Sequence, residues 1–112
     1  MADKDKILDT LERLEVDAYD DEKDARIEIT QCKPSKLFNL ISRSSFYRTM
    51  AGVAEEEFPE DLDIKEHVKS SKDLFINKTL GLTSKFEKEC LCLSKERIGT
   101  ELKEVLAKYK YV

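Results

Sequence analysis

Residues 29–54 read ITQCKPSKLFNLISRSSFYRTMAGVA, and this stretch decides the fold that the chain is expected to adopt. It contains no carboxylate, although Asp and Glu account for 24 of the 112 residues. Its basic residues are Lys33, Lys36, Arg43 and Arg48. A basic and partly apolar segment within an acidic chain is typical of a surface that meets an anionic or apolar partner.

The apolar residues of this stretch follow helical spacing, but they form two sets that face different ways. The first set is Leu37, Phe38, Leu40 and Ile41, and the second is Phe46, Met50, Val53 and Ala54. At about 100° per residue, one straight helix would point Phe46 roughly away from Leu37. We therefore predict a tight turn at residues 42–45 between two helices. Ser44 or Ser45 would cap the second helix, whose outer face would carry Ser45, Arg48 and Gly52.

Eight residues of this stretch resemble a known DNA-binding element. Residues 41–48, ISRSSFYR, are similar to the turn and the first recognition-helix residues of helix-turn-helix segments in resolvase-like and transposase-like proteins. The resemblance covers eight of the 112 residues and stops upstream, because such segments usually place a glycine just before the Ile position, where this chain has Leu40. It implies a helix that begins after Ser44 and enters the major groove of duplex DNA.

The rest of the chain is predicted to be mainly helical. Residues 3–19 form an amphipathic pattern that Asp3 can cap. The acidic run at residues 20–24 is expected to end that helix, because carboxylates are unfavourable near the negative end of a helix dipole. Later helices are expected to start at Asp63, Ser84 and Thr100, with stops at Gly81 and Gly99. Their buried faces are expected to include Ile64, Val68, Phe75, Phe86, Cys90, Leu93, Leu102 and Leu106.

Two short segments alternate with a period of two residues instead. Residues 26–30 read RIEIT and residues 108–112 read KYKYV, and such alternation suits half-buried strands. The two segments would pair as a two-stranded β ribbon, with a frayed helix as the alternative for the second. The predicted fold is therefore mainly α: one small helical domain over residues 1–112, with four or five helices, a helix-turn-helix-like break near 42–45 and this optional ribbon.

Charge alternates in sign along the chain. The formal charge is −6 for residues 1–28, +4 for 29–54, −6 for 55–66 and +4 for 67–112, which gives the total of −4. One interpretation is internal, with acidic and basic blocks facing one another in the fold. The other is that the basic block meets a partner, with the acidic blocks beside it.

The compartment is predicted from what the sequence lacks. No segment approaches the roughly 20 consecutive apolar residues of a membrane span, and the acidic N-terminus does not resemble a signal peptide. Three cysteines, an odd number, without a secretory signal indicate reduced thiols. We therefore expect a cytoplasmic protein in a reducing compartment, with no membrane partner.

Catalytic and metal-binding patterns are also missing. His67 is the only histidine and is expected to be a partly buried structural residue. Cys32, Cys90, Cys92 and His67 have the right count for a Cys3His zinc site. However, Cys90 and Cys92 would point about 200° apart on one helix and would not reach the same ion. We expect no enzymatic activity, no cofactor and no metal, with Cys90 in the core and Cys92 on the surface.

Two functions from different classes fit these observations. The favoured one is a small non-enzymatic helical adaptor or regulator that binds another protein through the basic and apolar surface of residues 33–54. The alternative is a helix-turn-helix module that reads duplex DNA with the helix after Ser44. The net acidic charge and the two acidic blocks, which would repel phosphates, favour the protein partner. The predicted partner-binding residues are Lys33, Lys36, Phe38, Arg43, Ser45, Tyr47, Arg48 and Met50.

Overall fold

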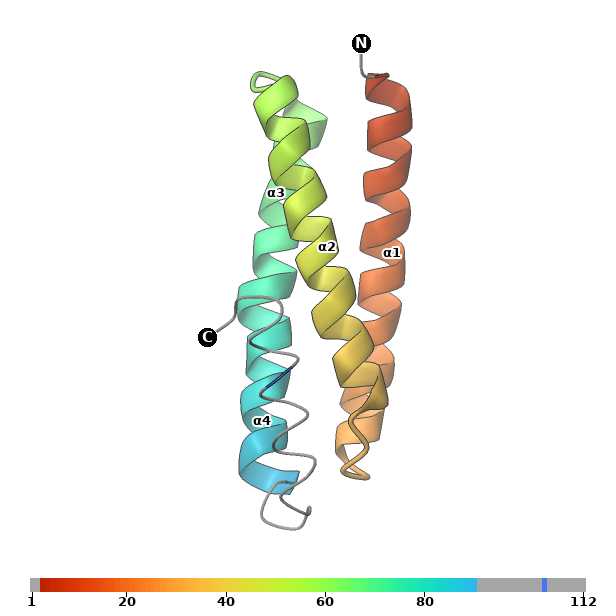
Figure 1. Cartoon of the computed structure of the whole chain (residues 1–112), viewed down its shortest axis with the longest axis vertical. Coiled ribbons are helices and arrows are strands. Elements are labelled where there is room, and N and C mark those ends of the chain that lie inside the picture. Colours follow the sequence, from red (N-terminus) through yellow and green to blue (C-terminus); the bar gives the residue numbers. More distant parts are fainter. Residues whose placement is uncertain (1–2, 91–103, 105–112) are drawn as a thin grey trace.

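The computed structural model describes residues 3–90 and Glu104. Within this part of the chain, three helical rods run alternately in opposite directions, and α2 lies between the other two in Figure 1. The elements are α1 (Lys4–Ile29), α2 (Ser35–Glu57), α3 (Leu62–Lys72), the π-helix η1 (Asp73–Thr79) and α4 (Leu80–Cys90). The third rod consists of α3, η1 and α4, which follow one another without a break. Because α1 also packs against α3 and α4, the rods enclose a shared core. The mainly helical prediction is thus confirmed.

α2 runs without interruption from Ser35 to Glu57, so the predicted turn at residues 42–45 is wrong. Its buried residues are Leu37, Leu40, Ile41, Ser44, Tyr47, Ala51 and Ala54, spaced three, four or one residue apart along one face. Ser44 and Tyr47 extend the buried face of α2 beyond Ile41, the residue at which the first predicted apolar set ended. The expected second stripe is divided: Phe46 and Val53 are 54% and 49% exposed, whereas Ala54 is buried and Met50 packs against the core.

The polar group of Ser44 is accommodated by hydrogen bonds inside the core. Its hydroxyl donates to the carbonyl of Ile41 (3.3 Å) and accepts from the hydroxyl of Thr79 in η1 (3.2 Å). A buried hydroxyl without such partners would destabilise the fold. The hydrogen-bond partner that allows Ser44 to be buried therefore lies 35 residues away in the sequence.

α1 continues through the acidic run at residues 20–24 to Ile29, so the predicted end of the helix there and the predicted strand at 26–30 are wrong. The helix tolerates two buried carboxylates because each has a basic partner. Asp21 is approached by Arg43 of α2, and Glu22 pairs with Arg26 one turn later. The second segment of the predicted ribbon, 108–112, lies outside the described residues. Asp3 caps α1 as expected, by accepting from the Asp5 amide (3.0 Å).

The third rod starts earlier and runs further than its sequence signals indicate. Asp61, rather than Asp63, is the N-cap of α3, and its carboxylate accepts from the amide of Ile64 (3.0 Å). The expected stop at Gly81 and new start at Ser84 are wrong, because α4 passes through both positions. The expected burial of Ile64, Val68, Phe75, Phe86 and Cys90 is confirmed.

The π-helix η1 changes which residues of this rod face the core. A π-helix holds more residues in each turn than an α-helix, so it shifts the helical register. The neighbours Leu74 and Phe75 are both buried, at 0% and 7% exposure. The hydroxyl oxygen of Thr79 also lies 2.9 Å from the carbonyl oxygen of Leu74, so its single proton is shared between this widened turn and Ser44.

The remaining sequence predictions are unconfirmed, lie outside the described residues or are wrong. The described residues do not confirm four or five separate helices. Leu93, Leu102, Leu106, Cys92 and the helix expected from Thr100 lie outside the described residues. Cys32 and Cys90 are joined by a disulfide, so the prediction of reduced thiols is wrong for this pair in this structure. No helix among the described residues has both the length and the apolar character required to cross a membrane.

Candidate functional site

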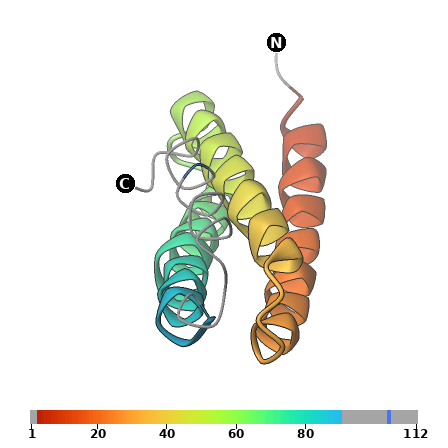
Figure 2. The ribbon, with the colours of Figure 1, turned by 60° about the horizontal axis from the view of Figure 1, so that its bottom comes forward.

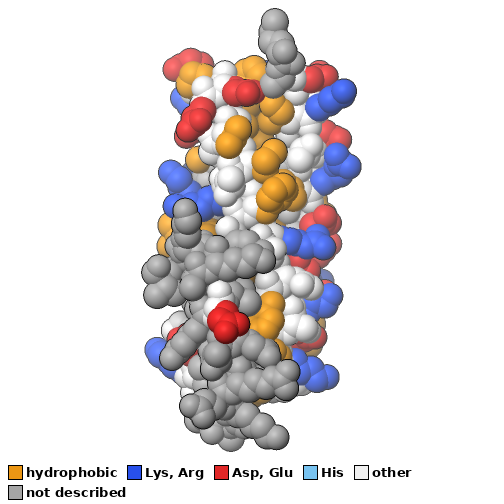
Figure 3. Space-filling model, in the orientation of Figure 1, with side chains coloured by type: hydrophobic (Ala, Val, Ile, Leu, Met, Phe, Trp, Pro, Cys, Tyr) orange, Lys and Arg blue, Asp and Glu red, His pale blue; other side chains and the backbone are white. Residues whose placement is uncertain are grey.

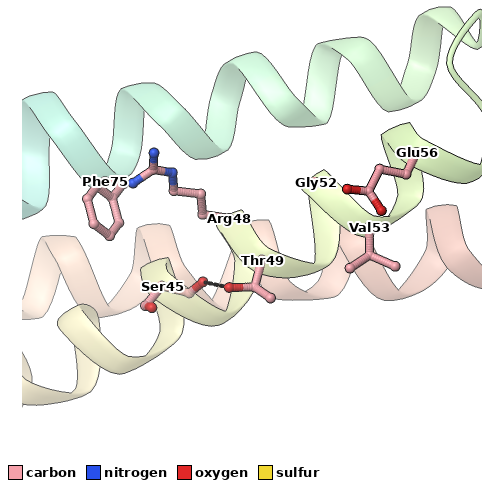
Figure 4. A pocket seen from close by; sticks show the side chains of 7 residues that line it. All are labelled: Ser45, Arg48, Thr49, Gly52, Val53, Glu56 and Phe75. Carbon is pink, nitrogen blue, oxygen red and sulfur yellow. Dashed lines mark hydrogen bonds between the residues drawn. The ribbon is translucent and has the colours of Figure 1, made fainter. Parts of the chain in front are cut away.

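A groove of about 360 Å³ follows the outer face of α2 where η1 passes beside it (Figure 4). Its lining residues are Ser45, Arg48, Thr49, Gly52, Val53 and Glu56 of α2 and Phe75 of η1. The six α2 residues share a face because they are spaced by three, four or one residue along an α-helix. Ser45, Arg48 and Gly52, which were predicted to share the outer face of a separate second helix, line this groove on the continuous α2.

Arg48 and Phe75 form one end of the groove. The guanidinium carbon of Arg48 lies 4.5 Å from the centre of the Phe75 ring, which is a cation–π distance. Arg48 forms no salt bridge with any described residue. Figure 4 shows its guanidinium at one end of the groove and the Glu56 carboxylate at the other. The groove therefore presents a positive charge and a negative charge at opposite ends.

Gly52 lies between these ends, in the interior of α2. Glycine in a helix interior lowers stability by about 1 kcal/mol relative to alanine. A Cβ built at Gly52 would meet no atom within 4 Å, so internal packing does not require glycine here. The missing side chain leaves the middle of the groove open.

Apolar side chains are exposed on the same helix. Phe46 is 54% exposed and Val53, which lines the groove, is 49% exposed. In the upper part of Figure 3, above the grey residues, hydrophobic side chains lie in the middle of this face and charged side chains lie mostly at its edges. An apolar strip with a charged rim is the arrangement found in protein–protein interfaces.

Arg43 lies on a different side of α2 and forms ion pairs with carboxylates of α1. Its Nε lies 2.7 Å from Oδ2 of Asp21, and its Nη1 lies 3.1 Å from Oδ2 of Asp17. Burial raises the pKa of the Asp21 carboxyl, and the positive charge of Arg43 offsets part of that rise. Arg43 thus neutralises carboxylates within the fold and does not belong to the groove.

Tyr47 was predicted to contact a partner, but it is fully buried and does not reach the surface. Its hydroxyl donates to Oε2 of Glu15 in α1 (3.0 Å) and lies 2.7 Å from Nδ1 of His67 in α3. Burial, followed by the Glu15 charge, raises the pKa of Tyr47. The cluster links all three rods through one neutral phenol, and His67 is partly buried, as expected.

The other predicted partner-binding residues are dispersed. Lys33 is exposed in the turn before α2. The backbone N–H of Lys36 donates to Oε1 of Glu28 (2.8 Å), which caps the start of α2. Phe38 and Met50 are half-buried against the core. Of the eight predicted residues, only Ser45 and Arg48 line the groove.

Sequence reasoning missed three of the groove residues, Thr49, Glu56 and Phe75, and assigned Val53 to the core. The helical spacing from Arg48 would have suggested Thr49 and Glu56 once α2 was known to be continuous. Phe75 carried no signal for this role, because its position beside Arg48 depends on the π-helical register. Among the described residues, no group of three or more His, Cys, Asp or Glu side chains is arranged to hold a metal ion.

Comparisons of the chain with models of protein families, with curated proteins and with solved structures found no match.

Proposed function

We propose that this protein is a small non-enzymatic adaptor or regulator that binds another protein through the α2 groove. The observation that carries the proposal is Gly52. The chain holds a helix-weakening residue in the middle of α2, although the space around it would accept a larger side chain. An open groove beside the exposed Phe46 and Val53 gives that glycine a role outside the fold.

The geometry favours an amphipathic helix of the partner protein as the bound element. The groove extends from Ser45 to Glu56, which at 1.5 Å per residue is about 16 Å, or three helical turns. Helices bind in such grooves by inserting apolar side chains spaced three or four residues apart. The partner helix would place apolar side chains against Val53, a carboxylate beside Arg48 and a basic residue beside Glu56.

The DNA-binding alternative has lost the geometry on which it was based. Its helix-turn-helix requires a break near residues 42–45, and α2 has none. Arg43, which would have contacted phosphate, already lies against two carboxylates of α1. No observation in the described residues favours DNA over a protein partner, so nucleic acid is an outcome to be tested.

The proposal is tested by affinity capture from cells of the source organism, with and without nuclease. The test variant is Gly52→Leu, whose side chain would fill the groove. The matched control is Gly81→Leu in α4, where an added Cβ also meets no atom within 4 Å but where no groove residue lies. Thermal melting of both variants checks that they remain folded.

We expect one protein to be captured by the parent and by Gly81→Leu, to resist nuclease treatment, and to be lost with Gly52→Leu. Equal capture by folded Gly52→Leu would contradict binding in the groove. Loss of all capture after nuclease treatment would instead support nucleic acid as the ligand and overturn the proposal.

A further inference from the structure

The turn between α1 and α2 adopts a backbone conformation that usually requires glycine, but it contains a cysteine. Cys32 has a φ of 52°, in the left-handed region. Its N–H donates to the carbonyl of Ile29 (3.0 Å), and the N–H of Lys33 donates to the carbonyl of Glu28 (3.0 Å). These two bonds define a Schellman motif, in which the left-handed position is most often glycine.

The side chain of Cys32 accounts for this unfavourable conformation. A Cβ disfavours left-handed backbone, so a residue other than glycine at such a position suggests a functional constraint. Cys32 is bonded to Cys90, the last residue of α4, with the two Cα atoms 5.3 Å apart and 58 residues between them in sequence. Figures 1 and 2 both show the end of α4 beside the α1–α2 turn.

The position of Cys90 suits both a disulfide and a free thiol. Cys90 is fully buried, and its Sγ lies 3.5 Å from the carbonyl oxygen of Ile29 near the end of α1. A reduced Cys90 would donate its S–H to this oxygen, because a carbonyl has two lone pairs and accepts a second hydrogen bond. The buried sulfur therefore has a hydrogen-bond acceptor beside it once the disulfide is reduced.

We propose that Cys32 and Cys90 form a reversible redox site that exchanges with small thiols and disulfides of the glutathione class. Cys32 is half-buried in a turn, whereas Cys90 has no exposed surface. An external reagent therefore reaches Cys32 first, and Cys90 is the resolving residue. Access of this kind decides which sulfur is attacked in thiol–disulfide exchange.

The exchange balances as two successive substitutions. The Cys32 thiolate attacks one sulfur of the small disulfide, forms a mixed disulfide and releases one small thiolate. The Cys90 thiolate then attacks Sγ of Cys32, closes the protein disulfide and releases the second small thiolate. Two electrons pass from the protein to the small disulfide, and the two protein thiol protons end on the released thiols. Reduction follows the reverse path and frees the end of α4 from the α1–α2 turn.

The site is tested in a Cys92→Ser variant, which retains only the two cysteines of the pair. The protein is equilibrated in buffers with different ratios of reduced to oxidised glutathione, its thiols are alkylated, and its mass is measured. We expect two alkylated thiols in reducing buffer and none in oxidising buffer. The two thiols should disappear together as the buffers become more oxidising, without a stable glutathione adduct. Persistence of both thiols in the most oxidising buffer would overturn the proposal.

Single replacements distinguish the two sulfurs. With Cys90→Ser added, oxidised glutathione should leave a stable adduct on Cys32. With Cys32→Ser added, Cys90 should remain an unmodified thiol in the folded protein. An adduct on Cys90 but none on Cys32 would contradict the assigned order of attack. As a backbone control, Cys32→Gly should melt at a higher temperature than Cys32→Ser in reducing buffer, because glycine suits the left-handed position.

Discussion

Two arginines on α2, Arg43 and Arg48, have opposite roles because different rods lie beside them. Arg43 faces α1 and contacts the carboxylates of Asp17 and Asp21. Arg48 faces η1, stacks on the ring of Phe75 and has no carboxylate partner among the described residues. Among the described residues, carboxylates of α1 therefore neutralise one side of the basic stretch, called the closed side below, and no carboxylate does so on the other, called the open side. The charge of a segment does not by itself show which of its residues are available to a partner.

The closed and open sides of α2 should differ most in their contribution to stability. Leu40→Ala removes a fully buried side chain and should lower the free energy of unfolding by about 2–5 kcal/mol. Val53→Ala removes a half-exposed side chain and should change it by no more than about 0.5 kcal/mol. Urea unfolding of both variants measures the difference. Equal losses would show that the groove side is buried in solution.

The two arginines provide the next test. Arg43→Ala leaves the buried Asp21 carboxylate without its partner and should cost about 1–3 kcal/mol at neutral pH. Arg48→Ala removes a cation–π contact at the surface and should cost about 0.5–1 kcal/mol. Chemical unfolding measures both values, and a larger cost for Arg48 would contradict the division into closed and open sides.

The Arg43 comparison also has a pH dependence. Because burial raises the folded-state pKa of Asp21 above its ordinary value of 3.8, the folded state binds this proton more tightly than the unfolded state. The contribution of Asp21 to stability therefore improves as pH falls through its raised folded-state pKa toward 3.8. Accordingly, the cost of Arg43→Ala should shrink as pH falls, which repeated unfolding in acidic buffers would show.

Glu28 of α1 caps α2 on the closed side and should contribute less to the free energy of unfolding than Arg43 does. It accepts from the N–H of Lys36 and from the hydroxyl of Ser35, and the Lys36 hydrogen bond is the main cause that holds the pKa of Glu28 below its ordinary value of 4.5. Its stabilisation is therefore complete above pH 4.5 and is lost as pH falls through the lowered folded-state pKa. Glu28→Gln should cost about 1 kcal/mol at pH 7 and less at pH 3, which is below the ordinary value of 4.5. Glu57→Gln, at an exposed position, is the control for urea unfolding at both pH values.

The smallest effect should be a gain in stability from a substitution on the open side of α2. Gly52→Ala should stabilise the protein by about 0.5–1 kcal/mol, because alanine favours the helix and its Cβ meets no atom within 4 Å. Gly81→Ala should give a similar gain in α4, away from the groove. Thermal melting compares the two variants. A loss of stability in Gly52→Ala would mean that the fold needs this glycine and would contradict an open groove at this position.

Sequence patterns predicted several parts of the structure correctly. Asp3 caps α1, Ile64 and Val68 face the core, and Ser45 and Arg48 face outward. These predictions depend on spacing within one helix and on hydrogen bonds to its first turn. Both are local properties, so they can be recognised without knowledge of the neighbouring helices.

Sequence by itself therefore determined that the chain is mainly helical and which faces of several helices are apolar. Tertiary structure decided where the helices end. α2 continues through Ser44 because Thr79 of η1 supplies a hydrogen bond, and α1 continues through Asp21 because Arg43 of α2 supplies a positive charge. The position of Phe75 beside Arg48 likewise depends on the π-helical register of the third rod. For Ser44 and Asp21 the deciding partner lies on another helix, where neither periodicity nor local charge can reveal it.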